Sequence, residues 1–427
     1  MAPAPMRRFG LPSATALVVA SMVGSGVFTT GGFLLEQLQS PWLVLVAWLV
    51  GGIIAGCGAL SYGALARRFP ESGGEYLFLS RILHPAAGNI AGWISLLVGF
   101  SAPLAAAAYG FGEYLAPWLI SLTPQWSGTL LLCGMALLHG VNGVRGAWVQ
   151  NFTVAFKLAL MGLFIMLAWP RLHWEAAAGV ANAEVESGGF FASLILVSFS
   201  YSGWNAAVYL GGEVRDPERV LPRALLLGTG LVTLLYLALN TAFLFAATPG
   251  ELAGKADIGR AAAYALGGES WATALALLVA LALATSVSAM MMAGPRVYAR
   301  MAEDGFLPGW FAGREEGTPQ RAMLLQCALA LIFLWSSGFR ALLTYIGFTL
   351  GLSTAATVFA LIRLRFKDGL EVPVTGWPWA PFVYLLAVVA MTFSSIFHQP
   401  AESLLGLLTV VLGWLVWRLS LPRCNDG

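Results

Sequence analysis

The sequence is poor in charged residues, which make up 10% of its 427 positions, whereas 58% are hydrophobic. A soluble globular domain carries about 25% charged residues. Because no soluble core could bury so much apolar surface, the composition excludes a soluble protein. Apolar runs of about 20 residues recur along the whole length, and a helical run of that length crosses the hydrocarbon core of a bilayer. We therefore interpret residues 1–427 as a single, all-α polytopic membrane domain.

Cysteine and histidine are also scarce. The cysteines are Cys57, Cys133, Cys327 and Cys424, too scattered for a disulfide framework or a CxxC metal site. The four histidines share no metal-ligand spacing and form no HExxH helix, so we expect neither a metal nor a cofactor. A net charge of +2 gives no sign of a nucleic acid partner. No carboxylate is expected near the centre of a span, which disfavours dibasic substrates and a carboxylate proton relay.

Charge clusters and turn residues divide the chain into twelve apolar spans. The predicted spans are 11–37, 41–65, 87–115, 126–141, 147–169, 189–212, 222–247, 271–297, 322–336, 339–362, 379–396 and 401–417.

The orientation of these spans follows from the excess of Lys and Arg in cytoplasmic loops. With the N-terminus inside, the cytoplasmic side holds 18 basic residues, namely Arg7, Arg8, Arg67, Arg68, Arg81, Arg145, Arg215, Arg219, Arg223, Arg296, Arg300, Arg314, Arg321, Arg363, Arg365, Lys367, Arg418 and Arg423. The other side holds 4, namely Arg171, Lys255, Arg260 and Arg340. We therefore expect both termini in the cytoplasm, and we expect the protein in the cytoplasmic (inner) membrane.

Two spans carry helix-breaking residues at their centres. The first contains Gly24-Ser25-Gly26-Val27-Phe28, and the sixth contains Ser200-Tyr201-Ser202-Gly203-Trp204-Asn205. The first span would run outward and the sixth inward, so two five-helix units would be inverted relative to each other. This arrangement places a solute site at the membrane midplane. The units would be residues 11–169 and 189–362, followed by two additional helices within 379–417.

The two breaks have complementary polarity. Glycines let the first break leave helical geometry, and the free amides that follow suit a carboxylate. Carbonyls near Phe199 and Ser200 suit an ammonium group. Together they match an amino-acid zwitterion. The alternative for the glycines is close helix packing through small residues, and for Tyr201 and Trp204 it is packing between helices. Spacing alone leaves both interpretations open.

Lys157 is the basic residue that falls deep inside a span. A lysine there costs roughly 2.5 to 3.5 kcal/mol on insertion scales, so we expect it to face protein and to have partners. It could act as a fixed positive charge or as a proton carrier. The alternative is that it extends to the interface, but Leu158–Trp169 still follow it within the span.

Other function classes are weakly supported. An intramembrane serine protease would need a nucleophile with a histidine base, and the candidates Ser25 and His139 lie far apart in the sequence. We therefore do not expect an enzyme. A non-transporting receptor or scaffold would not need intact glycines at both breaks.

Several motifs resemble those of one family, in order along nearly the whole chain. Gly24–Phe28 is similar to G-S-G-I-F, Pro70–Tyr76 to P-x-S-G-G-E-Y, Phe199–Asn205 to F-A-Y-G-G-W-N and Gly212–Arg223 to E-E-V-x-N-P-x-R-N-L-P-R, and Pro295–Pro308 extends the match. These residues resemble amino acid permeases of the amino acid–polyamine–organocation (APC) superfamily, most closely its neutral, L-type branch and bacterial relatives.

The resemblance implies a LeuT-like fold of twelve transmembrane helices, with a five-plus-five inverted repeat, two C-terminal helices, and helices 1 and 6 unwound at the midplane. The substrate carboxylate would meet amides of Gly24, Ser25 and Gly26. The amine would meet carbonyls near Val23, Phe199 and Ser200. Around them, the Phe199 ring would form an inner lid, and Tyr201, Ser202, Trp204 and Asn205 would complete the second break.

The resemblance also gives Lys157 a role. It matches a lysine that replaces a sodium ion found in related folds and that bonds to the unwound first helix, with Ser286 or Ser288 nearby. Sodium dependence is therefore disfavoured, while proton coupling stays open. The loop 117–125 has no cysteine, so no disulfide-linked heavy chain is expected.

The function that we predict is alternating-access transport or exchange of amino acids, most of all neutral L-amino acids. A transporter of cationic amino acids or polyamines on the same fold is the alternative. Ser200 and Ser202 stand where the family often has Ala and Gly, so the side-chain preference stays open.

Overall fold

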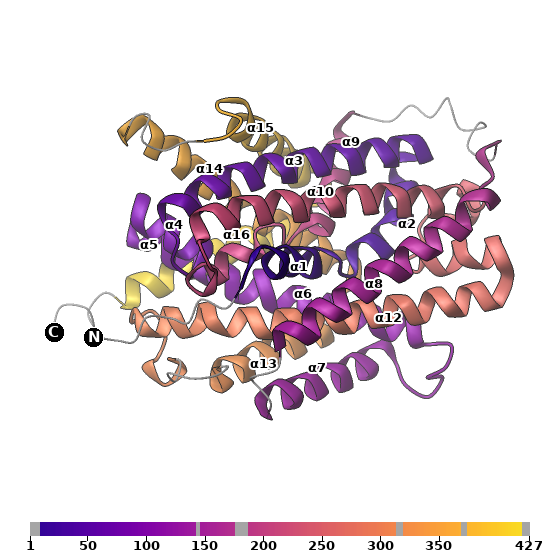
Figure 1. Cartoon of the computed structure of the whole chain (residues 1–427), viewed down its shortest axis with the longest axis horizontal. Helices are drawn as coiled ribbons and strands as arrows, with labels where there is room; N and C mark the ends of the chain where they lie inside the picture. Colours follow the sequence, from indigo (N-terminus) through magenta and orange to yellow (C-terminus); the bar gives the residue numbers. More distant parts are fainter. Residues whose placement is uncertain (1–8, 142–145, 176–186, 313–318, 369–373, 421–427) are drawn as a thin grey trace.

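The computed structural model describes residues 9–141, 146–175, 187–312, 319–368 and 374–420 (Figure 1). These residues form helices and, within the described ranges, no strand. Phe9 and Val214 make an isolated parallel bridge. Some residues used above lie outside the described ranges, namely Arg7, Arg8, Arg145, Arg314, Arg423 and Cys424.

The first part of the chain runs from α1 to η2. Its elements are α1 (Leu11–Met22), α2 (Gly26–Leu38), α3 (Pro41–Arg68), α4 (Gly74–Ile82), α5 (Pro85–Ile94), the π-helix η1 (Ser95–Ser101), α6 (Ala102–Leu115), α7 (Pro124–Val141), α8 (Gly146–Ala168) and the 3₁₀ turn η2 (Trp169–Arg171).

The second part runs from α9 to α16. Its elements are α9 (Ser187–Tyr201), the 3₁₀ segment η4 (Ala206–Glu213), α10 (Pro217–Leu244), α11 (Pro249–Leu252), α12 (Ile258–Glu303), η5 (Gly309–Phe311), α13 (Gln320–Ser336), α14 (Phe339–Asp368), α15 (Trp379–His398) and α16 (Pro400–Ser420).

Local sequence sets several of these boundaries. Helix α3 begins with Pro41 directly after Ser40, whose hydroxyl accepts from the amide of Leu43 at 3.4 Å. Proline has no amide hydrogen, which costs nothing in the first turn because amides there have no helical acceptor. The serine hydroxyl accepts a hydrogen bond from another amide of the first turn. Pro85 begins α5 in the same way, after His84, whose ring accepts from the amide of Ala86.

Each of the twelve predicted ranges is occupied by a helix or by successive helical segments, several of which extend beyond the predicted bounds. By length and hydropathy, nine helices of the described residues can cross a membrane, and the bent pair α1 and α2 makes a tenth. Two features were not predicted. Helix α4 follows α3 as a short buried helix, and α12 begins at Ile258, well before the predicted span, with a kink at Gly267 and Gly268.

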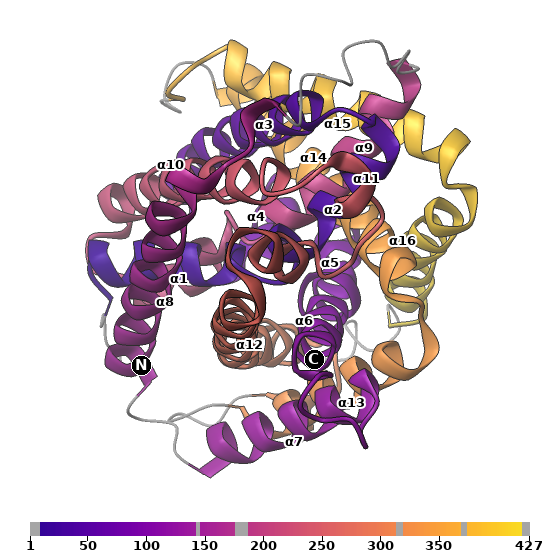
Figure 2. The ribbon, with the colours of Figure 1, turned by 90° about the vertical axis from the view of Figure 1, so that its right-hand side faces the viewer.

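The helices gather around the two breaks. Helix α3 lies along α10 (Figure 1), and α1 packs against α10 and α8. Figure 2 shows α7 beside α13 on one side of the bundle and α16 at another edge. Large apolar side chains such as Leu137, Met166, Leu386 and Phe393 are exposed on outer helices. Since polar side chains including Lys157 are buried instead, the outer surface suits lipid.

Close packing of α1 on α10 can be tested with two glycines of α10. A Cβ atom on Gly228 would lie 2.6 Å from Cγ1 of Val18, whereas one on Gly230 would meet nothing within 4 Å. Because Val18 is β-branched and stiff, we expect Gly228→Ala to destabilise the fold by about 1–3 kcal/mol. Thermal unfolding in detergent, followed by tryptophan fluorescence, measures this. Gly230→Ala is the matched control, and equal unfolding temperatures for the two variants would contradict the packing.

Candidate functional site

The first break separates α1 from α2. Helix α1 ends at Met22, α2 begins at Gly26, and their axes are bent by 41°. Carbonyls that lose their helical partners here accept from side chains of other helices, and the Met22 carbonyl also accepts from the amide of Gly24 at 2.8 Å. The Gly24 amide, expected to face the substrate carboxylate, is therefore engaged within the break. The hydroxyl of Tyr236 donates to the Met22 carbonyl at 2.5 Å, and Nζ of Lys157 donates to the Val23 carbonyl at 3.2 Å. Two helices, α10 and α8, thus hold the broken end of α1.

The start of α2 presents the opposite polarity. Ser25 occupies the N-cap position, but no side chain caps the helix. The hydroxyls of Thr29 and Thr30 donate backwards to the carbonyls of Ser25 and Gly26, at 2.9 and 2.7 Å. The first amides of a helix have no helical acceptor. They therefore point toward the break as donors, where the helix dipole favours an anion.

The second break separates α9 from η4. Helix α9 ends at Tyr201, and a turn leads to Ala206. Within this turn Gly203 has φ +96°, a conformation that other residues rarely adopt. The amide of Ser202 donates to the carbonyl of Phe199 at 2.9 Å. The chain thus leaves helical geometry where the sequence predicted a break.

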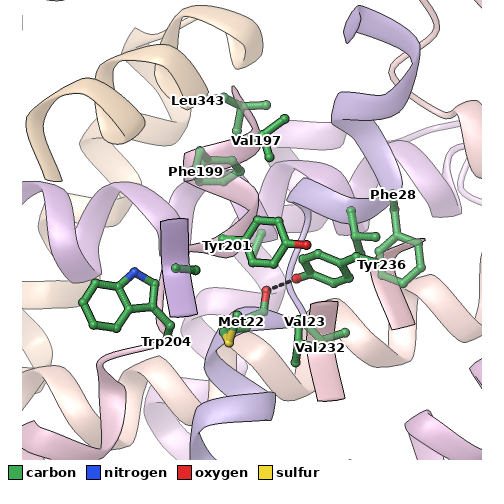
Figure 3. Packing of buried hydrophobic residues seen from close by; sticks show 14 of the residues in the cluster. Met22, Val23, Phe28, Val197, Phe199, Tyr201, Trp204, Val232, Tyr236 and Leu343 are labelled. Atoms are coloured by element: carbon green, nitrogen blue, oxygen red, sulfur yellow. Dashed lines mark hydrogen bonds between the residues drawn. The ribbon is translucent and has the colours of Figure 1, made fainter. Parts of the chain in front are cut away.

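One side chain joins the two breaks. The hydroxyl of Tyr236, on α10, lies within hydrogen-bonding distance of the carbonyl of Met22 (Figure 3). It also lies 3.0 Å from the carbonyl of Ser200. A phenol has a single proton to donate. Only one of the two carbonyls can receive it at a time, and the other can then accept from a further donor.

The breaks also interlock through glycines. A Cβ atom on Gly26 would lie 2.6 Å from Cα of Ser200, and one on Gly203 would lie 2.8 Å from the carbonyl oxygen of Ser21. Both approaches are too close for any side chain. Close packing, left open above as the alternative for the glycines, therefore accompanies the breaks.

A cavity lies between the breaks. Its polar lining includes Ser21, Ser25, Ser200, Ser202, Asn205, Tyr209, Ser286 and Thr354. Its apolar lining includes Phe100, Pro103, Ala107, Phe199, Trp204, Met290, Ala293 and Leu350. No Lys, Arg, His, Asp or Glu side chain lines it in the described part of the chain. The cavity can therefore hold a small, partly apolar solute whose own charges are met by backbone groups.

Most of the predicted site residues line this cavity. They are Gly24, Ser25, Gly26, Phe199, Ser200, Ser202, Trp204, Asn205 and Ser286. Val23 and Lys157 lie behind the first break, bonded to each other. Tyr201 points away from the cavity. Its hydroxyl donates to the carbonyl of Trp48 at 3.0 Å, and its ring packs against Tyr236 (Figure 3).

The two candidate serines of α12 face different neighbours. Ser286 lies across from the first break, with its hydroxyl 3.4 Å from where a Cβ atom of Gly24 would be. Ser288 instead bonds to the ring of His139 at 2.8 Å. Positions two apart on a helix point in different directions. The structure therefore favours Ser286 as the hydroxyl at the break.

Sequence reasoning missed two features of this region. Tyr236 is a lone tyrosine in the middle of the apolar span 222–247. A tyrosine so far from the membrane–water interfaces needs a partner for its hydroxyl, and this was the available signal. The second is Glu75, a buried carboxylate that contacts Asn205 and Tyr209 behind the cavity. Its sequence context, Glu71-Ser72-Gly73-Gly74-Glu75, indicated a loop, yet α4 begins there.

Comparisons with known proteins agree over nearly the whole chain. A family model described as "Amino acid permease" matches residues 9–416. The "Large neutral amino acids transporter small subunit 2" of Mus musculus is 31% identical, over 98% of this chain and 83% of that protein. The "Asc-type amino acid transporter 1" of Mus musculus is 28% identical over the same shares. The "b(0,+)-type amino acid transporter 1" of Mus musculus is 26% identical, over 96% of this chain and 87% of that protein.

Proposed function

The chain belongs to the amino acid permease family, and from this premise we propose that it is a secondary transporter or exchanger of neutral L-amino acids. The observation that carries the proposal is the cavity between the two breaks, whose described lining has no ionisable Lys, Arg, His, Asp or Glu side chain. A substrate with a charged side chain would find no counter-ion there. A neutral side chain fits beside Phe100, Met290 and Leu350.

The carboxylate of the substrate binds at the start of α2. The amides of Ser25 and Gly26 lack helical acceptors, and Gly24 and Gly26 carry no side chains to obstruct an approach. A carboxylate is stabilised there by the amide donors and by the helix dipole together.

The ammonium group binds at the carbonyls of the opposite half-helices. Tyr236 can donate to Met22 or to Ser200, but not to both at once. The carbonyl left without that proton accepts from the ammonium group. Binding thus adds a donor to the carbonyl that Tyr236 does not serve, which favours closure of the helices around the substrate.

The topology that we propose is a LeuT-like inverted repeat of twelve spans. We place the protein in the cytoplasmic membrane, with both termini in the cytoplasm. Short helical segments support it: α4 follows the second span, and Ile258–Leu266, before the kink, follows the seventh. Equivalent positions in two inverted units would place them on opposite sides of the membrane.

Coupling to sodium is disfavoured by the position of Lys157. Its side chain is fully buried and its ammonium group bonds to the Val23 carbonyl. The amine of Lys157 therefore already occupies the broken end of α1. Exchange and proton coupling both agree with this arrangement.

Other roles have less support. The matched relatives are named as transporters, not as enzymes. Cationic amino acids or polyamines would place a second positive charge in a lining without carboxylates. The name "Large neutral amino acids transporter small subunit 2" describes that relative as one subunit of a transporter. The expectation that this chain needs no disulfide-linked heavy chain is thus unsupported by the comparisons and stays a prediction.

Transport can be measured with the purified protein in proteoliposomes. We expect radiolabelled neutral amino acids to enter faster when an unlabelled neutral amino acid is inside, and the rate to persist when sodium is replaced by choline. Repeating the assay with a proton gradient separates exchange from proton coupling. Absence of flux for every amino acid and amine would overturn the proposal.

Lys157→Ala tests the link between α8 and the first break. It removes a charged hydrogen bond worth about 1.5–3 kcal/mol, and it leaves the Val23 carbonyl without that donor. We expect the initial rate of exchange to fall by about tenfold to a hundredfold, while the protein still purifies as a folded species. Phe156→Ala, at an adjacent exposed side chain, is the control and should keep its rate. Unchanged kinetics in Lys157→Ala would remove this lysine from the mechanism.

A further inference from the structure

Glu75 is a buried carboxylate directly behind the cavity. It lies in the first turn of α4, and only 2% of its surface is exposed. A carboxylate at the start of a helix is stabilised by the helix dipole. It does not line the cavity itself, but two of its partners, Asn205 and Tyr209, do.

Three neutral side chains donate to this carboxylate. The Tyr62 hydroxyl, from α3, donates to Oε1 at 2.9 Å. The side-chain amide of Asn205, which precedes η4, also donates to Oε1. The hydroxyl of Tyr209, on η4, donates to Oε2. Glu75 therefore ties α3 and α4 to the segment that follows the second break, with three donors on its two oxygens.

The contact with Glu75 fixes the direction of the Asn205 amide. An asparagine side chain has a donor end, Nδ2, and an acceptor end, Oδ1. Here Nδ2 donates to Oε1 of Glu75, and it also lies 3.4 Å from the hydroxyl of Tyr209. Oδ1 is consequently turned away from the carboxylate. Since Asn205 is part of the cavity lining, its acceptor end is the one available to a solute.

We propose that Glu75 is a positioning residue for substrate selectivity: it holds Asn205 so that the cavity presents a carbonyl oxygen, which favours substrates whose side chain carries a hydrogen-bond donor. The inference rests on the transport function proposed above. It deepens that function, because an otherwise neutral cavity distinguishes side chains by donor and acceptor character. A solute group that can only accept would face Oδ1 without a proton between them, and buried unpaired acceptors are costly.

Glu75→Gln tests the orientation. A glutamine at this position can donate to Oδ1 of Asn205, so the amide is free to reverse and present Nδ2 to the cavity. The probes are norvaline, 2,4-diaminobutyrate and O-methylserine, whose side chains have equal numbers of non-hydrogen atoms. The first has no polar group, the second has only donors, on an amine that also carries a positive charge, and the third has only an acceptor. Norvaline and O-methylserine have uncharged side chains, so their comparison is independent of charge. The readout is kcat/KM of each probe in proteoliposomes, divided by the value for norvaline.

In Glu75→Gln we expect the diaminobutyrate ratio to fall by at least about tenfold, and the O-methylserine ratio to rise, relative to the wild-type protein. Tyr62→Phe is the matched control. It removes another donor to the same oxygen but leaves Asn205 oriented, so both ratios should stay at their wild-type values.

Two results would overturn the inference. One is a Glu75→Gln protein that folds and keeps both ratios. The other is a fall of the diaminobutyrate ratio with an unchanged O-methylserine ratio, since that would show an effect of charge alone. If Glu75→Gln does not fold, Asn205→Ala removes the amide itself and should erase the wild-type difference between norvaline and O-methylserine, whose side chains carry no charge; persistence of that difference would also overturn the inference. A wild-type protein that moves none of the probes contradicts the proposed function instead.

Discussion

Backbone groups freed from helical hydrogen bonds inside a membrane need partners, and this constraint shapes the centre of the molecule. Within hydrocarbon each unsatisfied group costs several kcal/mol. At the two breaks the protein meets most of this demand with distant side chains, Lys157 at Val23 and Tyr236 at Met22 or Ser200. In the proposed function, the amides of Ser25 and Gly26 and whichever carbonyl Tyr236 does not serve bind the solute. The proposed binding site thus consists largely of backbone groups at the two breaks.

Packing makes the two breaks a single unit. Gly26 lies against Ser200, and Gly203 lies against Ser21, at distances that exclude any side chain. Movement of α1 relative to α9 therefore cannot leave either break unchanged. Lys157 and Tyr236 extend this unit to α8 and α10. Alternating access in such a protein requires rearrangement of this shared set of contacts, and a substrate that completes it biases the equilibrium between conformations.

Composition and periodicity were sufficient for the helical membrane class, the two breaks and the buried Lys157, because each is a local signal of apolar length, glycine content or misplaced charge. Helix α4 was missed because Ser72, Gly73 and Gly74 indicate a turn, and only tertiary packing buries Glu75 behind them. Tyr236 was missed because its two acceptors come from helices distant in sequence. The choice between Ser286 and Ser288 depends on which face of α12 points toward the first break, and the sequence pattern alone does not define that face.

The central claim is that the two breaks together bind both charged ends of an amino acid. Competition against exchange of a labelled neutral amino acid tests it most directly, with norvaline, butylamine, which lacks the carboxylate, and pentanoate, which lacks the amine. A charged hydrogen bond is worth about 1.5–3 kcal/mol, so each truncated analogue should compete at least about tenfold more weakly than norvaline. Competition by either analogue at the strength of norvaline would contradict the account.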